Sequence, residues 1–281
     1  MKRRILYLSV FALVAFPALL ALSGCESKAF KAEREMWRAH KSAQAVYKNP
    51  KGTPPFQLAA AQEQYRKIIK KYSDSLFAIQ SQFSIGHLYL VIGDFQKARV
   101  EYRKLTLDCD KKGNLCAEAF FAIGNSYELE GKWDDALSQY KMIMQSFSFS
   151  AKSLDLPLYI IRHYRKAGNE VAIKSAVDEA VSYYTGLKSK SETEKGGYIL
   201  QSLVTRSYLA GQQYEDALAS LDKVIRDYPK YNPEQTLWIK MLIYANRLKD
   251  NVKAKEILQK IVSDYPQSKL AKSAEVLLKK F

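Results

Sequence analysis

An alanine followed four positions later by a large apolar residue recurs along the chain, which is the spacing of two neighbours on one face of an α-helix. Five such pairs stand 37 or 38 residues apart, except for one gap of 81: Ala61 with Tyr65, Ala98 with Tyr102, Ala136 with Tyr140, Ala217 with Leu221, and Ala254 with Leu258. A period of this length predicts stacked helix pairs. We expect about six pairs, the first formed by residues 29–47 and 56–72, and a closing helix over residues 268–281.

The gap of 81 residues leaves room for one degenerate repeat. Residues 153–184 supply it, with aromatic and small residues in roughly equivalent places: Tyr164, Gly168, Ala172 and Ala176.

Turn and stop signals separate the predicted helices. Gly93 and Gly131 are placed to end the first helix of their pairs, and Asp94 or Asp134 can cap the second. Two helix stops of the same form stand 37 residues apart: Asp227-Tyr228-Pro229 and Asp264-Tyr265-Pro266.

A further motif precedes two of the alanines, as Ile85-Gly86-x-x-Tyr89 and Ile123-Gly124-x-x-Tyr127. Small residues let antiparallel helices cross closely, and tyrosines fill the space beside them. Together with the alanine and aromatic that follow, the motif resembles the tetratricopeptide repeat over most of residues 56–267. The resemblance implies an all-α, right-handed superhelical solenoid with a C-terminal capping helix.

Two segments that lead into helices, Tyr72-Ser73-Asp74-Ser75 and Tyr265-Pro266-Gln267-Ser268, are similar to members of this superfamily from the bacterial envelope. Two families share the form: the lipoprotein subunit of the outer-membrane β-barrel assembly machine, and the periplasmic Tol-Pal coordinating protein. The resemblance implies a function among other envelope proteins.

Composition agrees with a helical fold. Hydrophobic residues make up 47% of the chain and charged residues 26%, which argues against disorder, and only 12 glycines and 8 prolines interrupt helix-forming sequence. The net charge of +15 fits nucleic acid, an anionic membrane or an acidic partner. The N-terminus decides among these.

Residues 1–24 have the form of a secretory signal peptide, with Lys2, Arg3 and Arg4 ahead of an apolar run. An uncleaved membrane anchor is the competing interpretation. Leu22-Ser23-Gly24-Cys25 resembles the bacterial lipobox, which implies cleavage before Cys25 and covalent lipid on its thiol. We therefore expect a protein anchored by lipid to the periplasmic face of the outer membrane, where nucleic acid is not a partner.

The predicted organisation is a signal peptide (1–24), a lipid-proximal segment with the first helix (25–55), and the repeat solenoid (56–281). Residues 26–52 contain seven Lys or Arg and three Glu. This segment is either an ordinary solvated helix face or one that contacts anionic headgroups.

The sequence contains no phosphate-binding loop, no nucleophile elbow and no residues at metal-ligand spacing, so we expect neither an enzyme nor a cofactor beyond the lipid. His40, His87 and His163 fall in different repeats, and we expect each on a helix surface.

Function is expected in the concave groove of the solenoid, which would bind envelope proteins or peptides. The packing positions of the motif, such as Gly86 and Tyr89, face the partner helix, and residues offset from them by about one position face the groove. The candidate contacts are Phe83, His87, Phe121, Asn125, Arg162, Arg165, Arg206 and Trp238. The alternative is that the aromatic members pack between repeats.

Cys109 and Cys116 are the two cysteines left after Cys25, and export makes a disulfide between them a reasonable expectation. Two separate thiols are the alternative.

The predicted function is a lipid-anchored scaffold for protein-protein interaction, with outer-membrane protein assembly as one setting. A coordinator of peptidoglycan and outer-membrane synthesis is the alternative within this class. A solute-binding or enzymatic lipoprotein that uses the groove is the alternative of another class.

Overall fold

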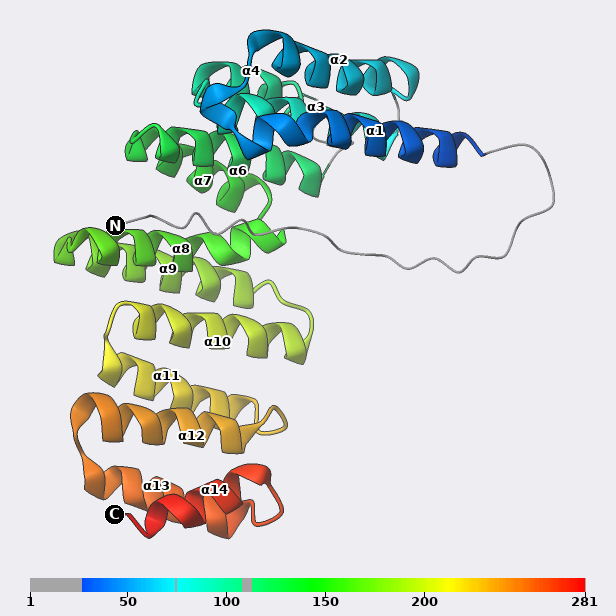
Figure 1. The fold of residues 1–281 in the computed structure, drawn as a ribbon. Helices are drawn as coiled ribbons and strands as arrows, with labels where there is room; N and C mark the ends of the chain where they lie inside the picture. The colour runs from blue at the N-terminus through cyan, green and yellow to red at the C-terminus, as the bar shows by residue number, and fades with distance from the viewer. Residues whose placement is uncertain (1–26, 74, 108–112, 281) are drawn as a thin grey trace. The chain divides into compact units, whose positions relative to one another are not determined.

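The computed structural model describes residues 27–73, 75–107 and 113–280, and every regular element in these ranges is helical (Figure 1). The predicted signal peptide and Cys25 lie outside the described residues. None of the described helices combines the length and the hydropathy needed to cross a membrane.

The chain divides into two compact units, residues 1–92 and 93–281. The described part of the first unit contains three α-helices and one short 3-10 turn: α1 (Lys28–Lys48), η1 (Pro50–Gly52), α2 (Pro55–Lys71) and α3 (Leu76–Val91). Helices α1 and α2 begin and end within one residue of the predicted 29–47 and 56–72.

One core joins the three helices of this unit. Ala39 and Ala43 of α1 are fully buried against Tyr65 of α2, and Ile85 of α3 belongs to the same cluster. Small residues on α1 bring its backbone close to α2, and the tyrosine ring fills the remaining space. The first helix is therefore part of the repeat packing.

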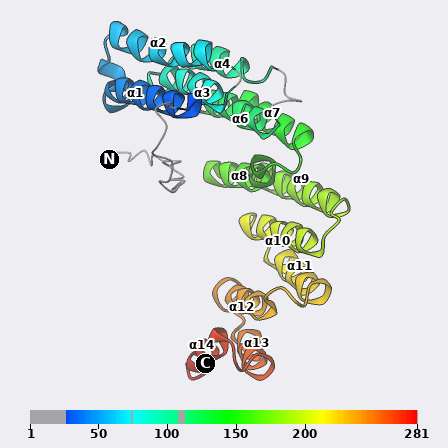
Figure 2. The ribbon, with the colours of Figure 1, turned by 90° about the vertical axis from the view of Figure 1, so that its right-hand side faces the viewer.

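The second unit begins with α4 and ends with α14. Its described elements are α4 (Phe95–Arg103), α6 (Asn114–Leu129), α7 (Trp133–Ser146), α8 (Ala151–Ala167), α9 (Glu170–Lys188), α10 (Glu194–Ala210), α11 (Tyr214–Asp227), α12 (Pro233–Ile243), the π-helical turn η2 (Tyr244–Leu248), α13 (Asn251–Asp264) and α14 (Lys269–Leu278). Figures 1 and 2 show α8 to α13 as antiparallel pairs stacked in chain order. The degenerate repeat predicted over 153–184 is the pair α8 and α9, and the predicted closing helix is α14.

The packing predicted from the repeat motif is present in α6 and α7. Ala136 and Tyr140 are fully buried, and a Cβ built on Gly124 would lie 2.5 Å from Cε1 of Tyr140. A side chain at position 124 would therefore displace the tyrosine ring.

The turn between the helices of a pair uses a left-handed residue five positions before the repeat alanine. Gly93 and Gly131 take this conformation with φ of 85° and 83°. Asp94 caps α4 by accepting a hydrogen bond from the backbone N–H of Lys97 at 3.1 Å. Asp134 does not cap α7, because α7 begins at Trp133 and Asp134 lies in its first turn.

Candidate functional site

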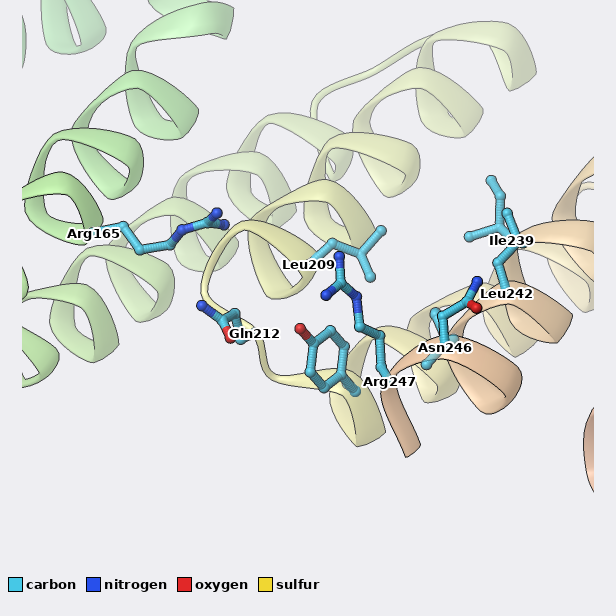
Figure 3. Close-up of a pocket in the computed structure, with 9 residues that line it drawn as sticks. Arg165, Leu209, Gln212, Ile239, Leu242, Asn246 and Arg247 are labelled. Atoms are coloured by element: carbon cyan, nitrogen blue, oxygen red, sulfur yellow. The ribbon is translucent and has the colours of Figure 1, made fainter. Parts of the chain in front are cut away.

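A pocket of about 410 Å³ lies between α8, α10 and α12, each of which is the first helix of its pair. The start of α11 and the turn η2 complete the pocket (Figure 3). We call it the 165–247 pocket. Its lining residues are Arg165, Leu209, Gln212, Tyr214, Ile239, Leu242, Ile243, Asn246 and Arg247.

The wall formed by α12 is apolar and open to solvent. Ile239 is 39% exposed and Leu242 is 40% exposed, and Leu209 of α10 lies on the same pocket. Branched aliphatic side chains gain free energy when they leave water, about 25 cal/mol for each Å² of apolar surface covered. The wall is therefore suited to an apolar group of a ligand.

The guanidinium groups of Arg165 and Arg247 line the same pocket as this apolar wall. Arg165 donates one hydrogen bond, from Nη1 to the carbonyl oxygen of Ala210 at 3.0 Å, at the end of α10. The guanidinium of Arg247 lies 6.0 Å from the ring centre of Tyr214. Neither arginine forms an ion pair within the described part of the chain, and the pocket lining contains no Asp or Glu. An arginine has five N–H donors, so both groups retain donors for an anionic ligand.

The backbone around the pocket is irregular in two places. Gln212 is left-handed, with φ of 60°, at the position where other repeats have Gly93 or Gly131. The residues that follow α12 form the π-helical turn η2, which contributes Asn246 and Arg247 to the pocket. Lys249 takes the same conformation, with φ of 58°, at the equivalent turn of the next repeat, so the left-handed residue belongs to the repeat turn. π-Helical turns recur at functional sites, and the position of η2 favours a binding role for this pocket.

The structure places the predicted groove residues of the second unit in different surroundings. Arg165 lines the pocket. Arg162 on α8 and Arg206 on α10 are exposed and do not line it. Phe121 stacks on Tyr140 with ring centres 5.6 Å apart. The remaining two, Asn125 and Trp238, are half-buried, and Trp238 packs against the core of α12 to α14. Phe121 therefore contacts the second helix of its own pair, and Trp238 contacts the core of the last three helices.

The other two predicted contacts belong to the first unit. Phe83 is half-buried on α3. The exposed ring of His87 lies 5.4 Å from the ring of Tyr47, and loss of solvent on that side lowers the pKa of His87.

Sequence reasoning missed a polar cluster between α6, α7 and α8. Tyr140 and Tyr159 donate hydrogen bonds to Glu128 Oε2 at 3.0 and 2.6 Å. His163 Nδ1 lies 3.6 Å from Glu128 Oε1, and its ring stacks on Trp133. Burial, with the carboxylate of Glu128 beside it, raises the pKa of Tyr159. His163 therefore faces neighbouring helices, contrary to the expected surface position.

The cysteines are only partly described. Cys116 is buried and disulfide-bonded. Cys109 lies outside the described residues, so its pairing with Cys116 stays a prediction. No group of three or more His, Cys, Asp or Glu that could hold a metal ion occurs in the described ranges.

Three segments match the family model of the tetratricopeptide repeat: residues 118–150, 199–231 and 235–268. They coincide with the pairs α6 and α7, α10 and α11, and α12 and α13. The chain thus contains tetratricopeptide repeats, and the all-α fold class predicted from the sequence is confirmed. Repeats of this class stack to form extended protein-binding surfaces.

Solved structures with related helix stacking are distant. One contains the nearly identical TPR-like repeats of a Podosopora anserina protein described as a kinesin light chain, with 16% identity, a TM-score of 0.40, and coverage of 72% of this chain and 97% of that one. Another is BtubC from P. vanneervenii, with 14% identity, a TM-score of 0.41, and coverage of 89% and 93%. No curated protein matches the chain in sequence.

Proposed function

We propose that the protein is a lipid-anchored scaffold of the bacterial envelope that binds a partner protein through the 165–247 pocket. The observation that carries the proposal is the pairing of an exposed apolar wall, Ile239 and Leu242, with two arginines that have no carboxylate partner in the described chain. The partner segment carries an apolar side chain next to a carboxylate.

Both halves of this recognition are needed for specificity. Covering Ile239 and Leu242 supplies affinity, and the two guanidinium groups select an anionic neighbour and reject a basic one. Arginine is also among the residues that most often dominate binding energy at protein interfaces.

The composition of the pocket favours binding over catalysis. Its lining has no His, Cys, Asp or Glu, so it offers neither a nucleophile with a base nor an acid-base pair. Outer-membrane assembly and coordination of peptidoglycan synthesis are both settings in which such a scaffold would act.

A photo-crosslinking amino acid at position 239 tests the proposal in the full chain expressed in bacteria. Position 142 on α7 is the matched control, because Met142 is 38% exposed and Ile239 is 39% exposed. We expect a discrete crosslinked protein from position 239 and none from position 142. Equal crosslinking from both positions, or none from 239, would reject the pocket as the binding site.

The anchor is tested independently of the pocket. The Cys25→Ala variant should remain an uncleaved precursor without lipid, because the cysteine thiol is the acceptor in the lipobox that this segment resembles. Cells grown with a labelled fatty-acid analogue should label the wild type alone. Equal label in both would rule out Cys25 as the lipidation site.

A further inference from the structure

Helix α1 has two chemically distinct faces. Its buried stripe consists of Ala32, Met36, Ala39, Ala43 and Val46, which pack on the rest of the first unit. Spacings of four, three, four and seven residues place a second set directly opposite that stripe: Phe30, Arg34, Trp37, Lys41 and Lys48.

This outer face combines exposed aromatic rings with basic side chains. Phe30 is 53% exposed and Trp37 is 61% exposed, and the Lys41 Nζ lies 5.2 Å from the centre of the Trp37 ring. The end of a repeat array normally presents a polar face to water. Two large aromatic rings at such an end need a different explanation.

The acidic residues of α1 lie away from the outer face. Glu33 falls at its edge, and Glu35 points to α2, where it pairs with Lys71 at 2.6 Å. The flank of α1 toward α2 is also rich in basic residues, with Arg38 beside Lys67 and Lys70 of α2. The charge presented outward is therefore positive, which complements an anionic surface.

The sequence places this face next to the predicted anchor. Lys28, the first residue of α1, is three residues after Cys25. Three residues span at most about 11 Å even when fully extended. A lipid on Cys25 would hold the start of α1 within reach of the headgroup layer.

We propose that the outer face of α1 lies on an anionic lipid surface, with Phe30 and Trp37 at headgroup depth and Lys41 and Lys48 against lipid phosphates. Tryptophan and phenylalanine among basic residues are the composition of helices that lie in the membrane interface. This inference rests on the lipid anchor of the proposed function. It adds a second, chemically specific contact that orients the first unit on the membrane.

The test uses the mature lipoprotein reconstituted into vesicles whose lipids carry bromine, which quenches tryptophan on contact. Brominated phosphatidylglycerol is compared with brominated phosphatidylcholine. The signal of Trp37 is obtained as the difference between the wild type and Trp37→Phe, since Trp133 and Trp238 are common to both. We expect Trp37 to be quenched in the anionic vesicles and largely unquenched in the neutral ones.

A second experiment reverses the charge of two lysines on the outer face of α1. Lys41→Glu with Lys48→Glu should lower the ratio of docked to undocked α1 by at least about tenfold. The matched control, Lys255→Glu with Lys260→Glu, reverses two exposed lysines on α13 and should leave the Trp37 signal unchanged.

The outcomes separate this inference from the anchor. Protein that floats with the vesicles while Trp37 stays unquenched in both lipids would overturn the α1 contact alone. Protein that floats with neither vesicle would overturn the anchor and the contact together. Shielding of Trp37 that depends on protein concentration and needs no lipid would mean that a second copy covers the face, and would also overturn the proposal.

Discussion

The ring of Tyr140 occupies the space that a side chain on Gly124 would need, with Cε1 at 2.5 Å from the position of an added Cβ. Tyr140 is fully buried and its hydroxyl is held by Glu128, so the ring has little freedom to move. We expect Gly124→Ala to lower the free energy of unfolding by about 1–3 kcal/mol through overpacking. Urea denaturation followed by circular dichroism measures it.

Gly186 provides the matched control. It lies inside α9 and nothing stands within 4 Å of an added Cβ. Gly186→Ala should raise the free energy of unfolding by about 0.5 kcal/mol, because alanine loses less backbone entropy in a helix. If Gly124→Ala and Gly186→Ala changed the free energy of unfolding similarly, the close contact between Gly124 of α6 and Tyr140 of α7 would be contradicted.

The left-handed turn at Gln212 gives a second prediction. Gln212→Gly should stabilise the fold by up to about 1 kcal/mol, since glycine adopts a φ of 60° without steric cost. Gly131→Ala, at the equivalent turn with φ of 83°, should destabilise it by about 1 kcal/mol. If Gln212 serves binding, its substitution will also weaken partner recovery. A loss of stability in Gln212→Gly would show that its side chain holds the turn.

The repeat frame was predictable because it depends on residues close in sequence. A small residue, a tyrosine and a turn recur at fixed spacing, and this set the helix pairs and the positions of Ala136 and Tyr140. The matching α1 and α2 boundaries rest on the same local signals.

The pocket was largely missed because it depends on how separate helices approach one another. Trp238 was predicted at the groove, whereas its neighbour Ile239 lines the pocket and Trp238 is half-buried against the core of α12 to α14. One residue corresponds to a rotation of about 100° around a helix, so an error of one position moves a side chain to another face. The π-turn that positions Arg247 left no signal in the periodicity. Arg165 was predicted among the groove contacts, and it lines the pocket.

Alkaline pH should destabilise the protein through its buried tyrosines. Burial raises the pKa of Tyr65 from 10.0 to about 12. The Tyr65 hydroxyl therefore loses its proton at a lower pH in the unfolded chain than in the folded protein. The contribution of Tyr65 to the free energy of unfolding is fully present below pH 10 and is lost as the pH rises toward 12. In the Tyr65→Phe variant, the free energy of unfolding should fall less over this pH range. The variant should also be less stable by about 1 kcal/mol below pH 10, because it lacks the hydrogen bond between Tyr65 and His40. Urea denaturation at pH 9 and pH 11 compares the variant with the wild type.

An intact disulfide between Cys109 and Cys116 should stabilise the protein. Closing so short a loop contributes about 2–3 kcal/mol to stability by restricting the unfolded chain. Mass spectrometry of unreduced periplasmic extract should find the two cysteines in one crosslinked peptide, and reduction should lower the melting temperature. Two alkylatable thiols in the oxidised protein would reject the pairing.

The central claim is that the 165–247 pocket binds the partner, and paired charge reversals test it most directly. Arg165→Glu with Arg247→Glu should reduce recovery of the partner crosslinked at position 239 at least about tenfold, because two charges of the wrong sign would face its carboxylate. The melting temperature should fall only slightly, through loss of the hydrogen bond from Arg165 to Ala210. Arg162→Glu with Arg206→Glu reverses two exposed arginines on α8 and α10 that do not line the pocket, and should leave recovery near the wild-type level. Equal loss from both pairs, or full recovery with Arg165→Glu and Arg247→Glu, would contradict the account.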